Sequence, residues 1–129
     1  MRYAYLPLAV WAGAMACAVV AAFRVFGMLE DDRIAGDIMA GIFRAVDSFG
    51  LIAALLAAAV SFSSKRRFVI ACVLAVGVAT NIFLIAPKIA VEGGRGGWHT
   101  ASERLWGVLL LGAVVLAVMG PPRVKSRGK

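Results

Sequence analysis

The sequence predicts an all-α protein, a polytopic membrane four-helix bundle, on the basis of three observations. Hydrophobic side chains make up 62% of the 129 residues, and the mean hydropathy is +0.89. The apolar residues gather in four stretches of membrane-spanning length, and lysine and arginine are unevenly divided between the segments around them. A soluble domain of this composition would expose large apolar patches, so we expect the lipid bilayer to surround the chain.

Four predicted helices follow from the apolar stretches, at about residues 3–23, 36–62, 68–88 and 103–119. The first has no charge, and as an α-helix it would rise about 31 Å, which matches the hydrocarbon core of a bilayer. An N-terminal arginine before an apolar run also resembles a secretory signal peptide. The run continues to Phe23, beyond any cleavage point at Ala16 or Ala18, so we predict a retained helix.

The ends of the other predicted helices are marked by charges and prolines. The second is free of charge only from Ser48 onward, so we expect it to begin outside the hydrocarbon. The third ends at Pro87 and Lys88, and the fourth stops before Gly120-Pro121-Pro122, because proline interrupts a helix. The four helices are predicted to form one domain, residues 1–122, which a basic cytoplasmic tail, residues 123–129, follows.

Cations determine the predicted orientation, because short cytoplasmic loops carry an excess of lysine and arginine. With both ends on one side, that side has eight cations and no acid: Arg2, Lys65, Arg66, Arg67, Arg123, Lys125, Arg127 and Lys129. The opposite side has the other cations and all seven acids. Both termini are therefore predicted to be cytoplasmic, in the inner membrane of a bacterium. The expected partner of the basic tail is anionic lipid and not nucleic acid, since no basic domain lies outside the membrane.

Small residues are expected to hold the helices together, because lipid gives apolar side chains little reason to prefer one another. They recur in three of the predicted helices: Ala9, Gly13 and Cys17; Ala53, Ala54, Ala57 and Ala58; and Ala71, Ala75 and Ala79. We expect all three stripes to lie in helix contacts within the bundle.

A polar cluster near the outer membrane boundary is the main candidate site: Asp37, Arg44, Asp47, Asn81 and Lys88. Helical spacing places Asp37 and Arg44 on one face, with Asp47 within reach of Arg44, and it places Asn81 and Lys88 on another face. Ionisable groups at membrane depth are costly unless they are paired or face a polar cavity, so one interpretation is a substrate or ion site. The other is structural, with an Arg44–Asp47 ion pair, a Lys88 that reaches the headgroups and an Asn81 that bonds a neighbouring helix.

His99 and Glu103 have the spacing i and i+4 and would project together if the last helix begins near Trp98. Together they could bind copper or zinc, although two ligands make only half of a tetrahedral site. The alternative is a structural pair at a helix entry. No other cofactor is predicted.

Several short motifs resemble a known family: Trp11-Ala12-Gly13, Phe23-Arg24, Ala35-Gly36, Ile42-Phe43-Arg44, Pro87-Lys88-Ile89 and His99-Thr100-Ala101-Ser102. Their layout over residues 6–118 resembles the bacterial domain of unknown function 4149. That family is similar to small eukaryotic transmembrane proteins and, more distantly, to the copper-resistance D membrane domain. The resemblance implies a four-helix membrane fold and points to Arg44, Pro87 and His99 as site residues.

The sequence does not define a biochemical activity. It contains no HExxH, P-loop, GxSxG or CxxC motif, so no enzyme is predicted. Four short helices enclose little room for a solute path, which favours a structural or partner subunit that forms a homo-oligomer or binds another membrane protein. One alternative is transport or binding of a metal ion, copper-like, or a small solute through the outer polar cluster. Another is a membrane enzyme subunit.

Overall fold

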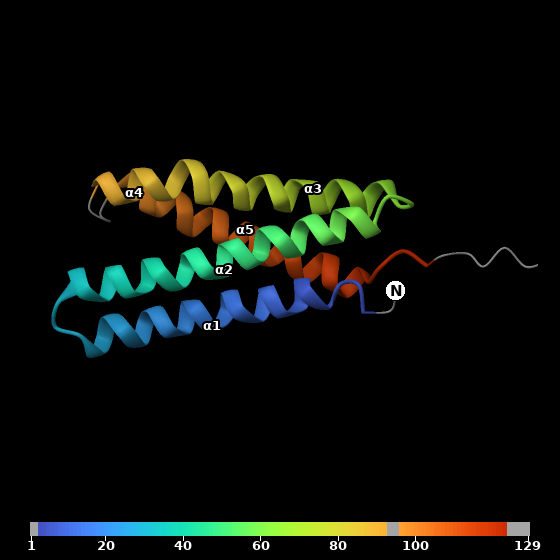
Figure 1. The fold of residues 1–129 in the computed structure, drawn as a ribbon. Coiled ribbons are helices and arrows are strands. Elements are labelled where there is room, and N and C mark those ends of the chain that lie inside the picture. The colour runs from blue at the N-terminus through green and yellow to red at the C-terminus, as the bar shows by residue number, and fades with distance from the viewer. Residues whose placement is uncertain (1–2, 93–95, 124–129) are drawn as a thin grey trace, which may run out of the picture.

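The computed structural model describes residues 3–92 and 96–123 of the chain. In these ranges all regular elements are helical, and four helices are long and apolar enough to cross a membrane (Figure 1). The four spans are α1 (Leu6–Met28), α2 (Asp32–Val60), a continuous helix Lys65–Val91 that we call the third span, and α5 (Gly97–Met119). The prediction of an all-α protein with four helices long and apolar enough to cross a membrane is confirmed.

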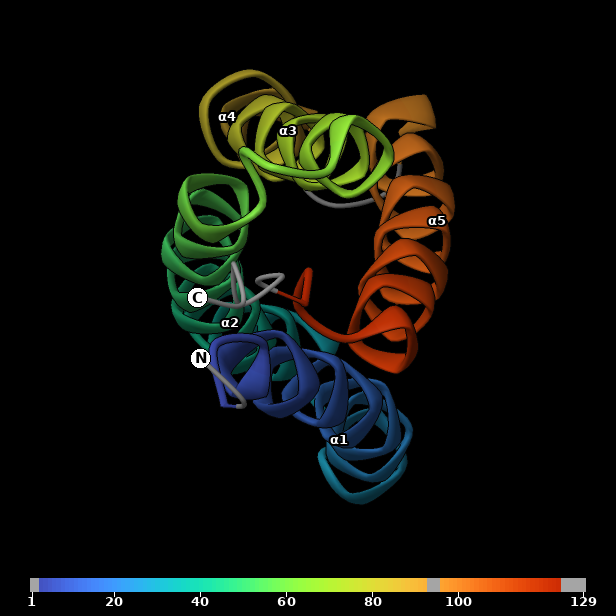
Figure 2. The same cartoon turned by 90° about the vertical axis from the view of Figure 1, so that its right-hand side faces the viewer.

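The four spans form a bundle in which each one packs against two neighbours (Figure 2). α2 lies between α1 and the third span, and α5 lies between the third span and α1. α2 and α5 are therefore opposite one another, across the diagonal of the bundle. The start of α1, the turn after α2 and the end of α5 share one end of the bundle (Figure 1). We call it the basic end, because Lys65, Arg66, Arg67 and Arg123 lie there.

On α1, α2 and α5, one helix boundary extends beyond the prediction. α1 continues past Phe23 to Met28, α2 begins at Asp32 instead of residue 36, and α5 begins at Gly97 instead of residue 103. The loss of apolar character marks the edge of the hydrocarbon and not the end of a helix, which can continue into water when its end is capped. At the start of α2, the Asp31 carboxylate accepts a hydrogen bond from the Arg33 backbone N–H at 2.9 Å, which is such a cap.

The third span also continues beyond its predicted end at Pro87 and Lys88. It is formed by α3 (Lys65–Thr80), a π-helical segment η1 (Asn81–Ile85) and α4 (Ala86–Glu92), which extends one residue beyond the span. Within η1 the Ala86 N–H donates to the Asn81 carbonyl, five residues back. Proline has no N–H to donate, and its ring crowds the preceding turn of a helix. The wider π turn before Pro87 accommodates the proline, so the helix continues beyond it.

The core confirms two of the three predicted small-residue stripes and contradicts the third. Ala53, Ala54, Ala57 and Ala58 of α2 are buried, as are Ala71 and Ala75 of α3, while Ala79 is half-buried. On α1, however, Ala9, Gly13 and Cys17 are exposed, and a Cβ added at Gly13 would meet nothing within 4 Å. The reason is that α1 turns its bulky residues Leu8, Trp11 and Met15 into the core, and one helix can bury only one face.

One predicted region, the basic tail of residues 123–129, falls mostly outside the described residues. Only Arg123 of this tail is described, and its side chain is exposed.

Candidate functional site

Four side chains from three spans form a hydrogen-bonded network inside the bundle. The Asp47 carboxylate, only 3% exposed, accepts from Asn81 Nδ2 at 2.6 Å and from Trp106 Nε1 at 2.8 Å. Ser102 Oγ donates to Asn81 Oδ1 at 2.8 Å. We call Asp47, Asn81, Ser102 and Trp106 the Asp47 network. It joins α2 to η1 and to α5, so it ties together the two spans that face each other across the diagonal.

The Asp47 network lies inside the apolar part of the spans. Asp47 precedes the end of α2 at Val60 by about 20 Å, and Trp106 precedes the end of α5 at Met119 by about 20 Å, at 1.5 Å per residue. The hydrocarbon core of a bilayer is about 30 Å thick. If the basic end marks one edge of the hydrocarbon, all the members of the Asp47 network lie within it.

Local features of the chain hold the network in place. Phe43, one turn before Asp47 on α2, packs edge-on against the Trp106 ring with centroids 4.7 Å apart and an interplanar angle of 75°. Asn81 is the first residue of η1, so the network meets the third span where its hydrogen-bond pattern changes. Single π turns inside α-helices occur frequently at functional sites, which makes this position a candidate worth testing.

A second indole lies one turn away on the same face of α2. Trp11 is fully buried and packs over Gly50, where an added Cβ would clash with the indole ring. Trp11 Nε1 is the one buried side-chain nitrogen or oxygen in residues 3–92 and 96–123 that has no hydrogen-bond partner. Two indoles thus approach α2 at adjacent turns. Trp106 has a carboxylate partner there, whereas Trp11 does not.

The structure brings together two of the five residues in the predicted polar cluster. Asp47 and Asn81 bond one another, but Arg44 and Asp37 are exposed, and no Arg44–Asp47 ion pair within 4 Å is present. The prediction of an ion pair between Arg44 and Asp47 is therefore wrong. Residues three apart differ by about 60° around a helix, and here that rotation separates an inward Asp47 from an outward Arg44.

Lys88 is also separate from Asn81. Seven residues of regular α-helix would have placed the two on one face. The hydrogen bonds of η1 join residues five apart instead of four, and this changes the rotation of Lys88 relative to Asn81. Lys88 instead lies on the surface, with its Nζ 4.0 Å from the centre of the Trp98 ring. This is a cation–π contact between α4 and the start of α5.

The predicted contact between His99 and Glu103 is present, with His99 Nε2 and Glu103 Oε1 3.1 Å apart and both side chains largely exposed. In the described part of the chain, no group of three or more His, Cys, Asp and Glu side chains could hold a metal ion. A metal bound at this pair would need further ligands from water or from another chain.

Sequence reasoning missed Ser102 and Trp106. The available signal was Trp106 itself, because tryptophan prefers the membrane interface, and the N–H of a buried indole usually finds an acceptor. Trp106 lies four residues after Ser102, so both face the same side of α5, toward Asn81 and Asp47.

The fold and the Asp47 network together define a four-span helical membrane protein with a hydrogen-bonded polar core. Comparison of the chain with protein-family models, curated proteins and solved structures finds no match.

Proposed function

We propose that this chain is a structural or partner subunit of a bacterial inner membrane and not an enzyme. The observation that carries the proposal is the internal pairing of the Asp47 network. Both oxygens of its carboxylate accept hydrogen bonds from other spans of the same chain, so the most polar group of the interior serves to join helices. Polar side chains that bond across membrane helices stabilise a bundle in this way.

The outward face of α1 supports a role in association. Gly13 and Cys17 are exposed on it, one turn apart, in a helix whose opposite face fills the core. Small residues spaced by four let two membrane helices approach closely, which is the usual basis of helix association in lipid. The partner is a second copy of this chain or another membrane protein.

The division of charge supports the orientation that we propose, with both ends of this chain in the cytoplasm. Lys65, Arg66 and Arg67 are the first three residues of the third span, at the basic end. Asp31 and Asp32 lie at the opposite end, just before α2 and at its first residue. An excess of cations marks the cytoplasmic side of inner-membrane proteins. A four-helix membrane fold is also what the resemblance to the domain of unknown function 4149 implies, and that resemblance stays a prediction.

Native mass determination in mild detergent tests the proposal. We expect a particle heavier than the single 13.5 kDa chain, and we expect Gly13→Leu to reduce it toward the single chain because the leucine separates the paired helices. Gly107→Leu is the matched control, since Gly107 of α5 is also exposed and has no atom within 4 Å of an added Cβ. A single chain in the wild type, or equal masses for the two variants, would contradict the proposal.

Binding of a metal ion or a small solute on the outer side is the second candidate, and the contact between His99 and Glu103 favours it. Copper or zinc would be held by neutral imidazole and carboxylate, with other ligands from water or a partner. Purified wild-type protein should then retain metal that a chelator removes, and His99→Ala should retain none. The same trace metal content in both proteins would exclude this site.

A further inference from the structure

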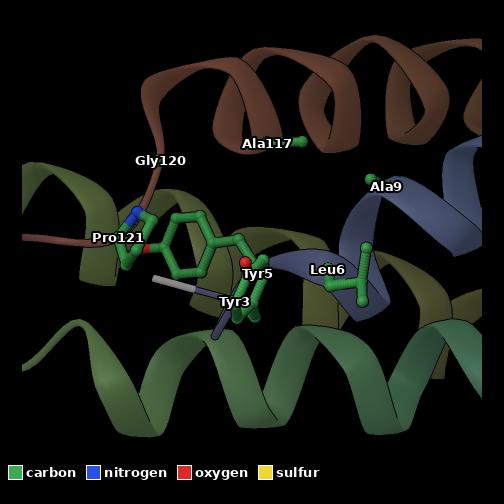
Figure 3. Close-up of a pocket in the computed structure, with 7 residues that line it drawn as sticks. All are labelled: Tyr3, Tyr5, Leu6, Ala9, Ala117, Gly120 and Pro121. Carbon is green, nitrogen blue, oxygen red and sulfur yellow. The ribbon is translucent and has the colours of Figure 1, made fainter. Parts of the chain in front are cut away.

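An open cleft lies at the basic end, between the start of α1 and the end of α5 (Figure 3). Its volume is about 220 Å³. Ala9 of α1 and Ala117 of α5 point toward one another across it, Leu6 lies beside them, and Tyr3 and Pro121 lie nearer the basic end. The part of the cleft between Ala9 and Ala117 is therefore apolar, and its aromatic part, formed by Tyr3 and Tyr5, lies nearer the basic end.

The size and surroundings of the cleft indicate what kind of molecule fits it. Pockets for small soluble ligands usually measure about 300–1,000 Å³ and enclose most of the ligand. This cleft is smaller and open, so it can take one segment of a larger molecule whose remainder lies along the helices. A lipid in the bilayer has that shape. Tyrosine at the rim is typical of the headgroup level of a membrane.

Arg67 provides positive charge beside the cleft. Its Nε donates to the Gly120 carbonyl at 2.9 Å, its Nη2 to the Met119 carbonyl at 3.3 Å, and its Nη1 to Ser64 Oγ at 3.3 Å. Gly120 itself lines the cleft. All three acceptors are uncharged, and these bonds occupy three of the five N–H groups of a guanidinium. Two N–H groups and a full positive charge remain for an anion.

Among the described residues, the basic end has no acidic side chain to compensate its cations. Lys65, Arg66 and Arg123 are exposed there, and every acid of the sequence lies between residues 30 and 47 or at positions 92 and 103, away from this end. Arginine binds phosphate well because its planar fork of donors matches the phosphate oxygens. An apolar cleft that opens beside unpaired cations matches a molecule with an acyl chain and an anionic phosphate headgroup.

We propose that the cleft between Ala9 and Ala117 binds an anionic phospholipid. Part of an acyl chain lies in the cleft, and the phosphodiester lies against Arg67 at the membrane surface. The proposal requires only that the four helices span a bilayer, so it is independent of the association that we propose for the outward face of α1.

Lipid retention tests this site. The protein is reconstituted in nanodiscs of equimolar phosphatidylglycerol and phosphatidylcholine, extracted in mild detergent, and analysed by native mass spectrometry for bound lipid. We expect phosphatidylglycerol to be enriched in the bound fraction by about fivefold, because one basic residue near an anionic surface contributes about 1 kcal/mol. Ala117→Leu fills the cleft and should remove the enrichment.

Two matched controls make the result specific. Ala59→Leu adds the same volume at an exposed position of α2 near the basic end and should leave the wild-type ratio unchanged. Arg67→Gln should lower the ratio about fivefold, whereas Arg33→Gln, an exposed cation at the opposite end, should not. If Arg67→Gln does not fold, the two alanine variants decide. Equal binding of both lipids by the wild type, or unchanged enrichment in Ala117→Leu, would overturn the proposal.

Discussion

Asp47 of α2 and Trp106 of α5 are joined by a hydrogen bond of 2.8 Å although their helices face one another across the diagonal of the bundle. The bond is possible because both side chains are turned inward and the indole is long enough to cross the centre. Asn81 of the third span bonds the other oxygen of the same carboxylate. One acidic side chain therefore holds three of the four spans at a common depth.

The first prediction follows from this arrangement. Asp47→Ala leaves the Asn81 amide and the Trp106 indole without their acceptor inside the bundle, and an unpaired buried polar group costs about 1–3 kcal/mol. We expect a loss of that size in the free energy of unfolding, measured by thermal or denaturant unfolding in detergent. Asp37→Ala removes an exposed carboxylate from the same helix and should change the stability by less than about 0.5 kcal/mol. Equal losses for the two variants would show that the Asp47 network does not stabilise the bundle.

The second prediction concerns the contact between Trp11 and Gly50. A Cβ at Gly50 would clash with the Trp11 ring, which is fully buried. Gly50→Ala should therefore lower the stability by about 1–3 kcal/mol, the usual cost of overpacking. Gly41→Ala, at an exposed position of α2 with nothing near an added Cβ, should be neutral or stabilising by up to about 1 kcal/mol, since alanine favours helix. A smaller side chain at Trp11 should rescue Gly50→Ala, and failure of that rescue would argue against the contact.

The third prediction tests the orientation. Because the cations of the basic end indicate the cytoplasm, a reporter enzyme that works only in the cytoplasm should be active when fused after Lys129. The same reporter inserted between Gly93 and Gly97 should be inactive. The reverse pattern of activity would contradict the proposed orientation.

The helices could be predicted from the sequence, whereas their rotation in the bundle could not. Long apolar stretches identify membrane spans because the bilayer requires a minimum length, and all four were found in this way. On α1, however, Ala9, Gly13 and Cys17 satisfy the small-residue spacing as well as the buried stripe of α2 does. The spacing alone does not reveal which face the neighbouring helices cover.

The candidate site could be predicted in part for the same reason. Asp47 and Asn81 stand out as polar residues in apolar stretches. The partner of Asp47 was expected to be Arg44 on the same helix, but its partners are Asn81 and Trp106, which lie on two other spans. Contacts across a bundle depend on the depth and rotation of each helix. The π-helical turn at Asn81 rotates the side chains that follow it, including Lys88, around the helix axis. No residue type within Asn81–Ile85 indicates such a turn.

Cross-linking through Cys17 in intact membranes tests most directly the central claim, that the chain associates through the outward face of α1. In a Cys72→Ser background, a short bifunctional thiol reagent should join Cys17, which is exposed, to a second copy or to another protein, and the mass of the product distinguishes the two. A single cysteine introduced as Gly107→Cys on α5, with both native cysteines changed to serine, is the control and should remain uncross-linked. A product that depends on Cys17 is the result that we predict. The absence of that product, or an equal yield from the Gly107→Cys control, would contradict the account.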